Sequence, residues 1–225
     1  MNLVFINSII DPPNHIPYSW EIGKKIPRSI FSKDERFEQT KNTIKSVKNK
    51  IPNSKIILVE CSKLSNDENN YFINNVDYFI NLFDIKDNDY ITTKIYGDKG
   101  YGERNMTIEA IKYIIDNNIN FDNFFKISGR YLINDCFNYD FYNNNNNIFI
   151  TSLNHTWCTT YIYKLNKISV NKMLNFLVDN EELFIKQTSM ERAYTYLLDH
   201  LYPFKDTLVL NSDLINNFND GITKL

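Results

Sequence analysis

Short apolar runs that alternate with helix-like stretches constrain the fold of this 225-residue chain more than any other feature. Residues 3–10, 55–59 and 124–127 have the length and the apolar character of buried strands. The stretches between them carry apolar residues at helical spacing. Strands that alternate with helices indicate a mostly parallel sheet covered on both faces. We therefore predict an α/β fold: a single domain over residues 1–225, with a mixed, mostly parallel sheet flanked by helices.

Several boundaries can be predicted from local signals. Ser32 is a good helix N-cap, Glu35 completes a capping box, and Pro52 ends the helix. The Pro-rich segment 11–28 is long enough to be a functional flap. The remaining predicted helices are 69–76, 107–115, 171–178 and 189–198. The remaining predicted strands are 77–81, 148–151 and 159–163, and we expect the last two to pair with each other.

Composition excludes several classes of protein. The net charge of −2 gives no electrostatic reason to expect nucleic acid as a partner. Three widely spaced cysteines without a C-x-x-C pair favour neither a zinc framework nor a disulfide scaffold. No apolar run approaches the roughly 20 residues of a membrane span, and no signal peptide is evident. We expect a soluble cytoplasmic protein without a transmembrane segment.

Asparagine is abundant and forms an uninterrupted tract at residues 143–147. Frequent Asn, Ile, Lys, Tyr and Phe are typical of AT-rich coding, as in a low-GC bacterium, a protist or a large virus. A viral protein would act in the host cytoplasm or the virion. We predict that the tract is a solvated loop tip.

Cations cluster on one face of the predicted strand at 124–130. Because alternate strand residues share a face, Lys126, Ser128 and Arg130 should line one side together. Burying Lys and Arg is costly unless an anion meets them. A diphosphate is a natural partner for a guanidinium, and Gly129 would permit its close approach. A salt bridge to an Asp or Glu of the chain is the alternative.

A second cationic segment runs from Lys99 to Asn105 and contains Gly100 and Gly102. We predict that these glycines precede a helix that starts near residue 105 or 107. Helix N-terminal amides, together with Lys99 and Arg104, would suit a phosphate or nucleotide. A plain turn would explain the same glycines.

Three segments in succession resemble the GT-A-fold (family-2-like) glycosyltransferases. Val59-Glu-Cys-Ser62 is similar to their V-D-D-G-S turn, whose acidic residue contacts the nucleotide base. Residues 100–110 are similar to their G-x-x-x-A-R-N-x-G-I-x-x-A segment. Residues 120–130 occupy the place of their hydrophobic strand and D-x-D motif. The match in order and approximate spacing covers residues 1 to about 135.

The resemblance implies a GT-A-like (Rossmann-like) fold that transfers a sugar from a nucleotide-sugar donor, such as a UDP-sugar, to a hydroxyl of a glycan or other acceptor. The donor would bind residues 1–135 and the acceptor residues 136–225. The implied nucleotide-sugar-binding residues are Asn7, Ser8, Glu60, Ser62, Lys99, Arg104, Asn105, Lys126, Ser128 and Arg130.

The chain departs from the family at the metal-binding motif. In typical members the D-x-D carboxylates hold Mn²⁺ or Mg²⁺ against the diphosphate, but the corresponding turn here is Ser128-Gly129-Arg130. Either Arg130, aided by Lys126, replaces the charge of the metal, or Asp135 binds Mn²⁺ or Mg²⁺ instead. The literal D-x-D at residues 87–89 lies too early in the chain for that role.

Inverting transfer to a hydroxyl needs a general base. We predict Glu191 for this role, in the first turn of a helix capped by Ser189; a simple interaction with the helix dipole is the alternative. His155 and Trp157 are predicted to contact the acceptor, with structural roles as the alternative.

Two other functions remain open. A catalytically inactive nucleotide- or sugar-binding protein of this fold would explain the loss of D-x-D. A sugar nucleotidyltransferase would share a similar sheet but should have a Gly-rich loop after the first strand, and residues 7–13 contain no glycine. A dinucleotide-binding or methyl-donor enzyme lacks its expected G-x-G turn at the same place.

Overall fold

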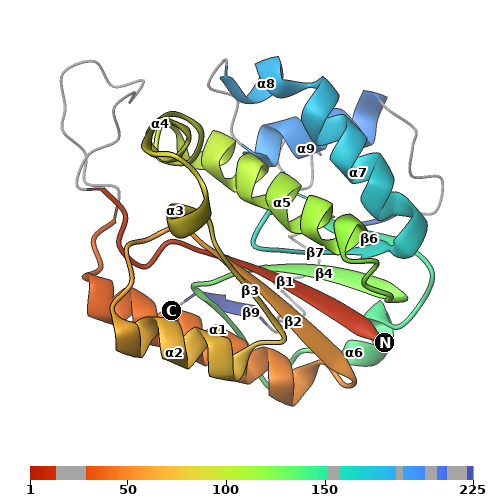
Figure 1. The fold of residues 1–225 in the computed structure, drawn as a ribbon. Coiled ribbons are helices and arrows are strands. Elements are labelled where there is room, and N and C mark those ends of the chain that lie inside the picture. The colour runs from red at the N-terminus through yellow and green to blue at the C-terminus, as the bar shows by residue number, and fades with distance from the viewer. Residues whose placement is uncertain (14–28, 152–157, 186–189, 201–206, 212–221, 225) are drawn as a thin grey trace.

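A seven-stranded sheet of order β3-β2-β1-β4-β7-β6-β8 runs through the middle of the molecule (Figure 1). The computed structural model describes residues 1–13, 29–151, 158–185, 190–200, 207–211 and 222–224. Within these residues, no helix is both long enough and apolar enough to cross a membrane.

The first half of the sheet is entirely parallel. β1 (Asn2–Ser8) pairs with β2 (Ser54–Glu60) on one side and with β4 (Asn123–Ser128) on the other, and β3 (Tyr78–Asn81) pairs with β2. The carboxyl ends of these four strands therefore meet at one edge of the sheet.

The second half is mixed. β7 (Ile162–Asn166) is antiparallel to both β4 and β6 (Asn147–Thr151), and β8 (Thr207–Asn211) is parallel to β6. The predicted mixed, mostly parallel sheet is confirmed, as is the β6–β7 pair. The second strand of that pair begins at Ile162 rather than Thr159, which leaves residues 159–161 as a connecting segment.

Helices cover both faces of the sheet (Figure 1). One layer contains α1 (Lys33–Lys50) and α2 (Asn66–Asn75), and the other contains α5 (Lys99–Asp116), α7 (Lys167–Asp179) and α9 (Met190–His200). The shorter elements are α3 (Leu82–Ile85), α4 (Asn88–Tyr90), the π-helix η1 (Ile91–Ile95), α6 (Tyr139–Tyr142), α8 (Glu181–Ile185), and a small sheet of β5 (Tyr131–Ile133) and β9 (Ile222–Lys224).

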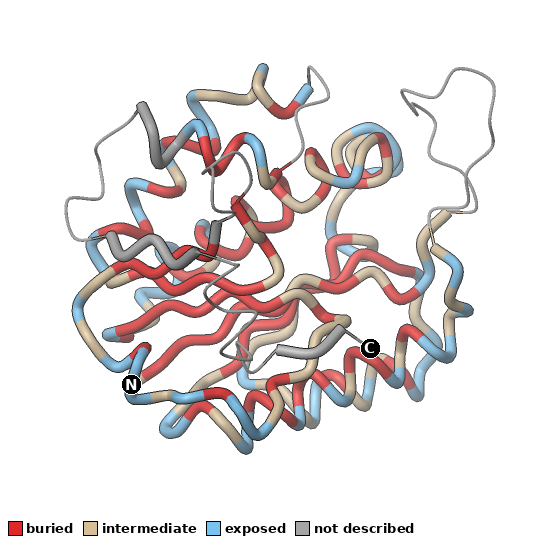
Figure 2. Tube along the Cα trace, turned by 180° about the vertical axis from the view of Figure 1, so that it is seen from behind, coloured by how far each residue is buried: buried red, intermediate tan, exposed pale blue. Residues whose placement is uncertain are grey.

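Strand alternation divides the core into two apolar clusters. Leu3 and Phe5 belong to the cluster under α5 and α7, whereas Val4 and Ile6 belong to the cluster that packs on α1. Both faces of β1 are thus buried, as the continuous apolar sequence predicts. Most residues of the central strands are accordingly buried (Figure 2).

The two main helix starts were predicted with different success. The capping box at Ser32 and Glu35 is present, and α1 ends before Pro52 as predicted. The predicted start of the next long helix at residue 105 or 107 is wrong, because the Asp98 carboxylate accepts hydrogen bonds from the amides of Gly100 and Tyr101. This cap starts α5 at Lys99, so both glycines lie within the helix.

The Asn tract is only partly the solvated loop that its sequence predicts. Asn143 and Asn145 are exposed, but Asn147 is buried at the start of β6. The Lys164 ammonium is fully buried and donates to the backbone carbonyls of Asn144 and Asn146, the latter at 2.7 Å. The tract therefore covers a buried lysine.

Candidate active site

A cavity of about 530 Å³ lies at the carboxyl ends of β1 and β4. This is the edge where open α/β sheets bind ligands. Its walls come from these two strand ends, α1, the start of α5, residues 159–161 and the start of α9. The polar residues that line it include Asn7, Ser8, Arg36, Thr40, Asp98, Lys99, Glu103, Ser128, Arg130, Thr160 and Glu191.

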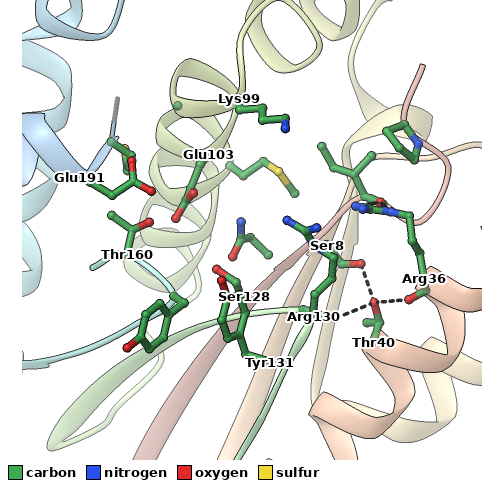
Figure 3. A pocket seen from close by; sticks show the side chains of 18 of the residues that line it. Ser8, Arg36, Thr40, Lys99, Glu103, Ser128, Arg130, Tyr131, Thr160 and Glu191 are labelled. Atoms are coloured by element: carbon green, nitrogen blue, oxygen red, sulfur yellow. Dashed lines mark hydrogen bonds between the residues drawn. The ribbon is translucent and has the colours of Figure 1, made fainter. Parts of the chain in front are cut away.

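The turn after β4 is held tightly against β1. The Gly129 amide donates to the Asn7 carbonyl at 2.9 Å, and a Cβ on Gly129 would lie only 3.0 Å from that oxygen. Thr40 reaches over from α1, with its hydroxyl 2.9 Å from Ser8 Oγ and 3.2 Å from the Gly129 carbonyl. Gly129 thus permits a close approach of backbone to backbone, and the turn directs Arg130 into the cavity (Figure 3).

Two charged groups in the cavity have no partner among the described residues. The half-buried Arg130 guanidinium makes no hydrogen bond or ion pair with any of them. The half-buried Glu191 carboxylate makes none either; only the backbone carbonyl of Glu191 is used, accepting from the Cys158 amide and the Thr195 hydroxyl. Glu191 lies in the first turn of α9, as predicted, whereas Ser189 lies outside the described residues.

Lys126 is positioned differently from the prediction. It shares a face with Ser128, but it is fully buried beneath the cavity and does not line it. Its ammonium donates to Ser128 Oγ at 2.7 Å, to the Thr160 carbonyl and to the Glu103 carboxylate. Burial lowers the pKa of Lys126, and the Glu103 charge opposes that shift. For Lys126 the structure therefore contains a salt bridge, which is the alternative to anion binding given by the sequence.

Glu60 and Ser62 form an internal network after β2 and do not line the cavity. The fully buried Glu60 Oε1 accepts from the Ile10 amide at 3.0 Å and from the Ser62 hydroxyl at 2.6 Å. Ser62 Oγ also accepts from the Asp11 amide. Burial raises the pKa of Glu60. These contacts tie the segment after β1 to the segment after β2.

Arg104 and Asn105 are likewise outside the cavity lining. Arg104 is buried and donates to the Leu177 carbonyl at 2.7 Å and to Asn105 Oδ1 at 2.7 Å. Asn105 in turn donates to the Tyr101 carbonyl. Its contact with Leu177 places residue 104 on the side of α5 that packs on α7.

The other predicted site residues fall into three groups. Asn7, Ser8, Lys99, Ser128, Arg130 and Glu191 are brought together in the cavity. His155 and Trp157 lie outside the described residues, as does most of the predicted flap from residue 14 to 28. Asp135 has an exposed carboxylate that pairs with Lys50 and is not part of the cavity lining.

The structure adds cavity residues that the sequence did not indicate. Arg36 extends from α1, where its Nε donates to the Ile9 carbonyl at 2.7 Å. Glu103 lines the cavity from α5, where it pairs with Lys126. The need of a buried lysine for a counter-ion was the available signal for Glu103. No sequence signal indicated that Arg36 would line the cavity, because the position of its side chain depends on how α1 packs over β1.

The turn of residues 128–130, where the sequence predicts the counterpart of D-x-D, contains no carboxylate for a divalent metal. A guanidinium occupies this turn, and the Glu103 carboxylate of α5 is already paired with the Lys126 ammonium. Within the described ranges there is no group of three or more His, Cys, Asp or Glu side chains that could hold a metal ion. The chemistry of this turn is suited to an anion.

Known proteins resemble this chain in structure but not detectably in sequence. No protein-family model and no curated protein sequence matches it. A nucleoside-diphosphate-sugar pyrophosphorylase from Vibrio cholerae RC9 matches with a TM-score of 0.51 and 7% identity, over 94% of this chain and 91% of that one.

Two further solved structures are similar at lower TM-scores. A glycosyltransferase involved in glycosylation of the major capsid of PBCV-1 matches with a TM-score of 0.46 and 9% identity, over 93% of this chain and 81% of that one. A protein described as a nucleotide-diphospho-sugar transferase, from Desulfovibrio desulfuricans G20, matches with a TM-score of 0.48 and 7% identity, over 93% and 79%. At these identities the likeness concerns the fold alone: this chain shares its α/β fold with the pyrophosphorylase from Vibrio cholerae RC9.

Proposed function

We propose that this protein is a glycosyltransferase that moves a sugar from a nucleotide-sugar donor to a hydroxyl acceptor without a metal ion. The observation that carries the proposal is the pair of charged groups without partners, Arg130 and Glu191, which line one cavity at the carboxyl edge of the sheet. A buried or half-buried charge is costly without a partner, so such a pair in a cavity favours a ligand that supplies the missing contacts.

Arg130 would bind the diphosphate of the donor. A planar guanidinium can donate two parallel hydrogen bonds to phosphate oxygens. Negative charge grows on the diphosphate as it leaves, so a fixed cation at this position stabilises the transition state more than the ground state. Arg36 and Lys99 line the same cavity and add to its positive potential.

Glu191 would act as the general base. In the proposed step the acceptor oxygen attacks the anomeric carbon and the new C–O bond forms as the bond to the diphosphate oxygen breaks. The electron pair of the broken bond leaves with the diphosphate, and the acceptor proton passes to Glu191. A single displacement of this kind inverts the anomeric centre, so inversion is part of the proposal.

The two rival functions predict other features at this site. A decayed, inactive protein should leave Arg130 facing an apolar gap, whereas this cavity is lined by polar side chains from several elements. A nucleotidyltransferase should have a glycine-rich phosphate loop after β1, where residues 7–13 contain no glycine. Both observations favour the glycosyltransferase.

The proposal is tested by incubating the purified protein with a panel of nucleotide sugars, with EDTA or with Mn²⁺, and measuring nucleoside diphosphate release. We expect release in EDTA. A nucleotide at 100 times its dissociation constant should also stabilise the protein by about 2.7 kcal/mol in a thermal-shift assay. The absence of any response to nucleotides would overturn the proposed function. Activity that EDTA abolishes and Mn²⁺ restores would overturn only the metal-independent form.

A further inference from the structure

The charged side chains of the cavity are unevenly distributed. Glu103, Glu191 and Thr160 gather on one side, while Arg130 and Arg36 lie on the other (Figure 3). Lys99 lines the cavity from the first turn of α5. We call the Glu103 and Glu191 side the acidic wall. A cavity polarised in this way orients any pair of ligands that differ in charge.

The Glu103 carboxylate is fixed in its place on the acidic wall. Its Oε1 accepts from the fully buried Lys126 ammonium, which within the described part of the chain also donates to Ser128 Oγ and to the Thr160 carbonyl. An ammonium has three N–H donors, so Lys126 has none left for a ligand. Lys126 therefore connects three segments that line the cavity and holds the Glu103 carboxylate against it.

The acidic wall offers hydrogen-bond acceptors without matching donors. Among the described residues, Glu103 Oε2 and both carboxylate oxygens of Glu191 receive no hydrogen bond. A ligand that covers this wall buries these oxygens and must therefore supply O–H or N–H groups, because buried polar atoms are normally hydrogen-bonded.

The same wall disfavours anions. A carboxylate, sulfate or phosphate on the ligand would bring like charge against Glu191, which has no ion-pair partner among the described residues. It would also leave Glu103 Oε2 and the Glu191 oxygens without donors. The cationic side of the cavity is the favourable place for an anion, and the proposed donor diphosphate already takes it.

We infer that the acceptor is a polyhydroxyl compound whose reacting end carries no negative charge, such as a neutral sugar or an amino sugar, and that Glu103 selects for it. This inference rests on the proposed function, since it assigns the cationic side to the donor. Glu103 contacts the acceptor in this account, and Lys126 positions it.

The inference is tested with matched triplets of methyl glycosides in the gluco and galacto series, each comprising the neutral sugar, the 2-amino sugar and the uronic acid. Transfer from whichever donor the protein hydrolyses is measured by mass spectrometry. We expect the neutral and amino members to exceed the uronic acid by about tenfold or more in kcat/KM. Glu103→Gln should reduce that ratio, while Asp116→Asn, an equal charge change at the exposed end of the same helix, should not.

Binding of the same triplets by ligand-observed NMR supplies a measurement that needs no variant and no turnover. Uronic acids that bind or react as well as their neutral partners would overturn the inference, and so would a panel in which no member binds. An unchanged ratio in folded Glu103→Gln would remove Glu103 from acceptor selection. Donor hydrolysis that persists through any of these results would leave the proposed function standing.

Discussion

Polar residues line a cavity at each end of the central strands, but the two cavities differ in whether these residues have hydrogen-bond and ion-pair partners. At the amino end, around a cavity of about 420 Å³, Asn2 donates to the Pro52 carbonyl and the Tyr139 hydroxyl, and Asn123 donates to Asn2. At the carboxyl end, Arg130 and Glu191 have no such partners among the described residues. Polar groups that pair with one another leave nothing for a ligand to bind, whereas charges without protein partners favour a ligand that supplies the missing contacts.

Two buried lysines on neighbouring strands extend this comparison. Lys126 on β4 and Lys164 on β7 are both fully buried. Lys126 pairs with the carboxylate of Glu103, whereas the contacts of Lys164 among the described residues are hydrogen bonds to backbone carbonyls of the Asn tract. Lys126 thus fixes a carboxylate in the wall of the candidate site, and Lys164 holds a loop against the sheet.

The largest effect should come from Glu191→Gln. Loss of a general base lowers turnover by about 10²–10⁴-fold, and the amide keeps the shape of the side chain, so nucleotide affinity and melting temperature should hardly change. Steady-state kinetics with a hydrolysed donor, beside a nucleotide titration, measure both quantities. Turnover equal to that of the unsubstituted protein would exclude Glu191 from the mechanism.

A smaller but clear contrast should appear in stability between Lys126→Met and Arg130→Met. Removing one member of a buried ion pair costs about 3–5 kcal/mol, because the Glu103 charge is left without its partner. Arg130 makes no contact of that kind, so its substitution should change the free energy of unfolding by less than about 0.5 kcal/mol. Urea denaturation of both variants gives the comparison. Equal losses would mean that Arg130 has a structural role as well.

The smallest effect concerns the pH dependence of stability at the amino end. Burial lowers the pKa of Lys164 to about 8 from its ordinary value of 10.5. Above the lowered pKa the unfolded chain binds more protons than the native one, so the free energy of unfolding should rise with pH, by about 1 kcal/mol between pH 7 and pH 9. Lys164→Met should lack this increment when melted in parallel. Identical pH profiles would show that Lys164 stays charged in the native state.

The order of elements could be read from the sequence because each depends on local signals. The continuous apolar run at residues 3–6 predicts a strand buried on both faces, and the Ser32–Glu35 box predicts the start of α1. The start of α5 differs from the prediction because Gly100 and Gly102 favour a turn, whereas the Asp98 carboxylate caps the helix before them.

The site was predicted only in part, for a physical reason. Strand alternation placed Lys126 and Ser128 on one face, but it could not show that Glu103 of α5 reaches the same lysine. The segment similarity likewise placed Arg104 near the donor, whereas its contacts with Leu177 depend on how α5 packs on α7. Tertiary packing decides which cations form ion pairs or hydrogen bonds within the protein and which do not.

Whether Arg130 binds the diphosphate without a metal is measured by calorimetric titration of a nucleoside diphosphate in EDTA, with the unsubstituted protein and with Arg130→Met. We expect measurable binding in EDTA that weakens by about tenfold or more in the variant, because charge-assisted hydrogen bonds to the diphosphate are lost. Equal affinity of the two proteins, or binding that appears only when Mn²⁺ is added, would contradict the claim that Arg130 takes the place of a metal.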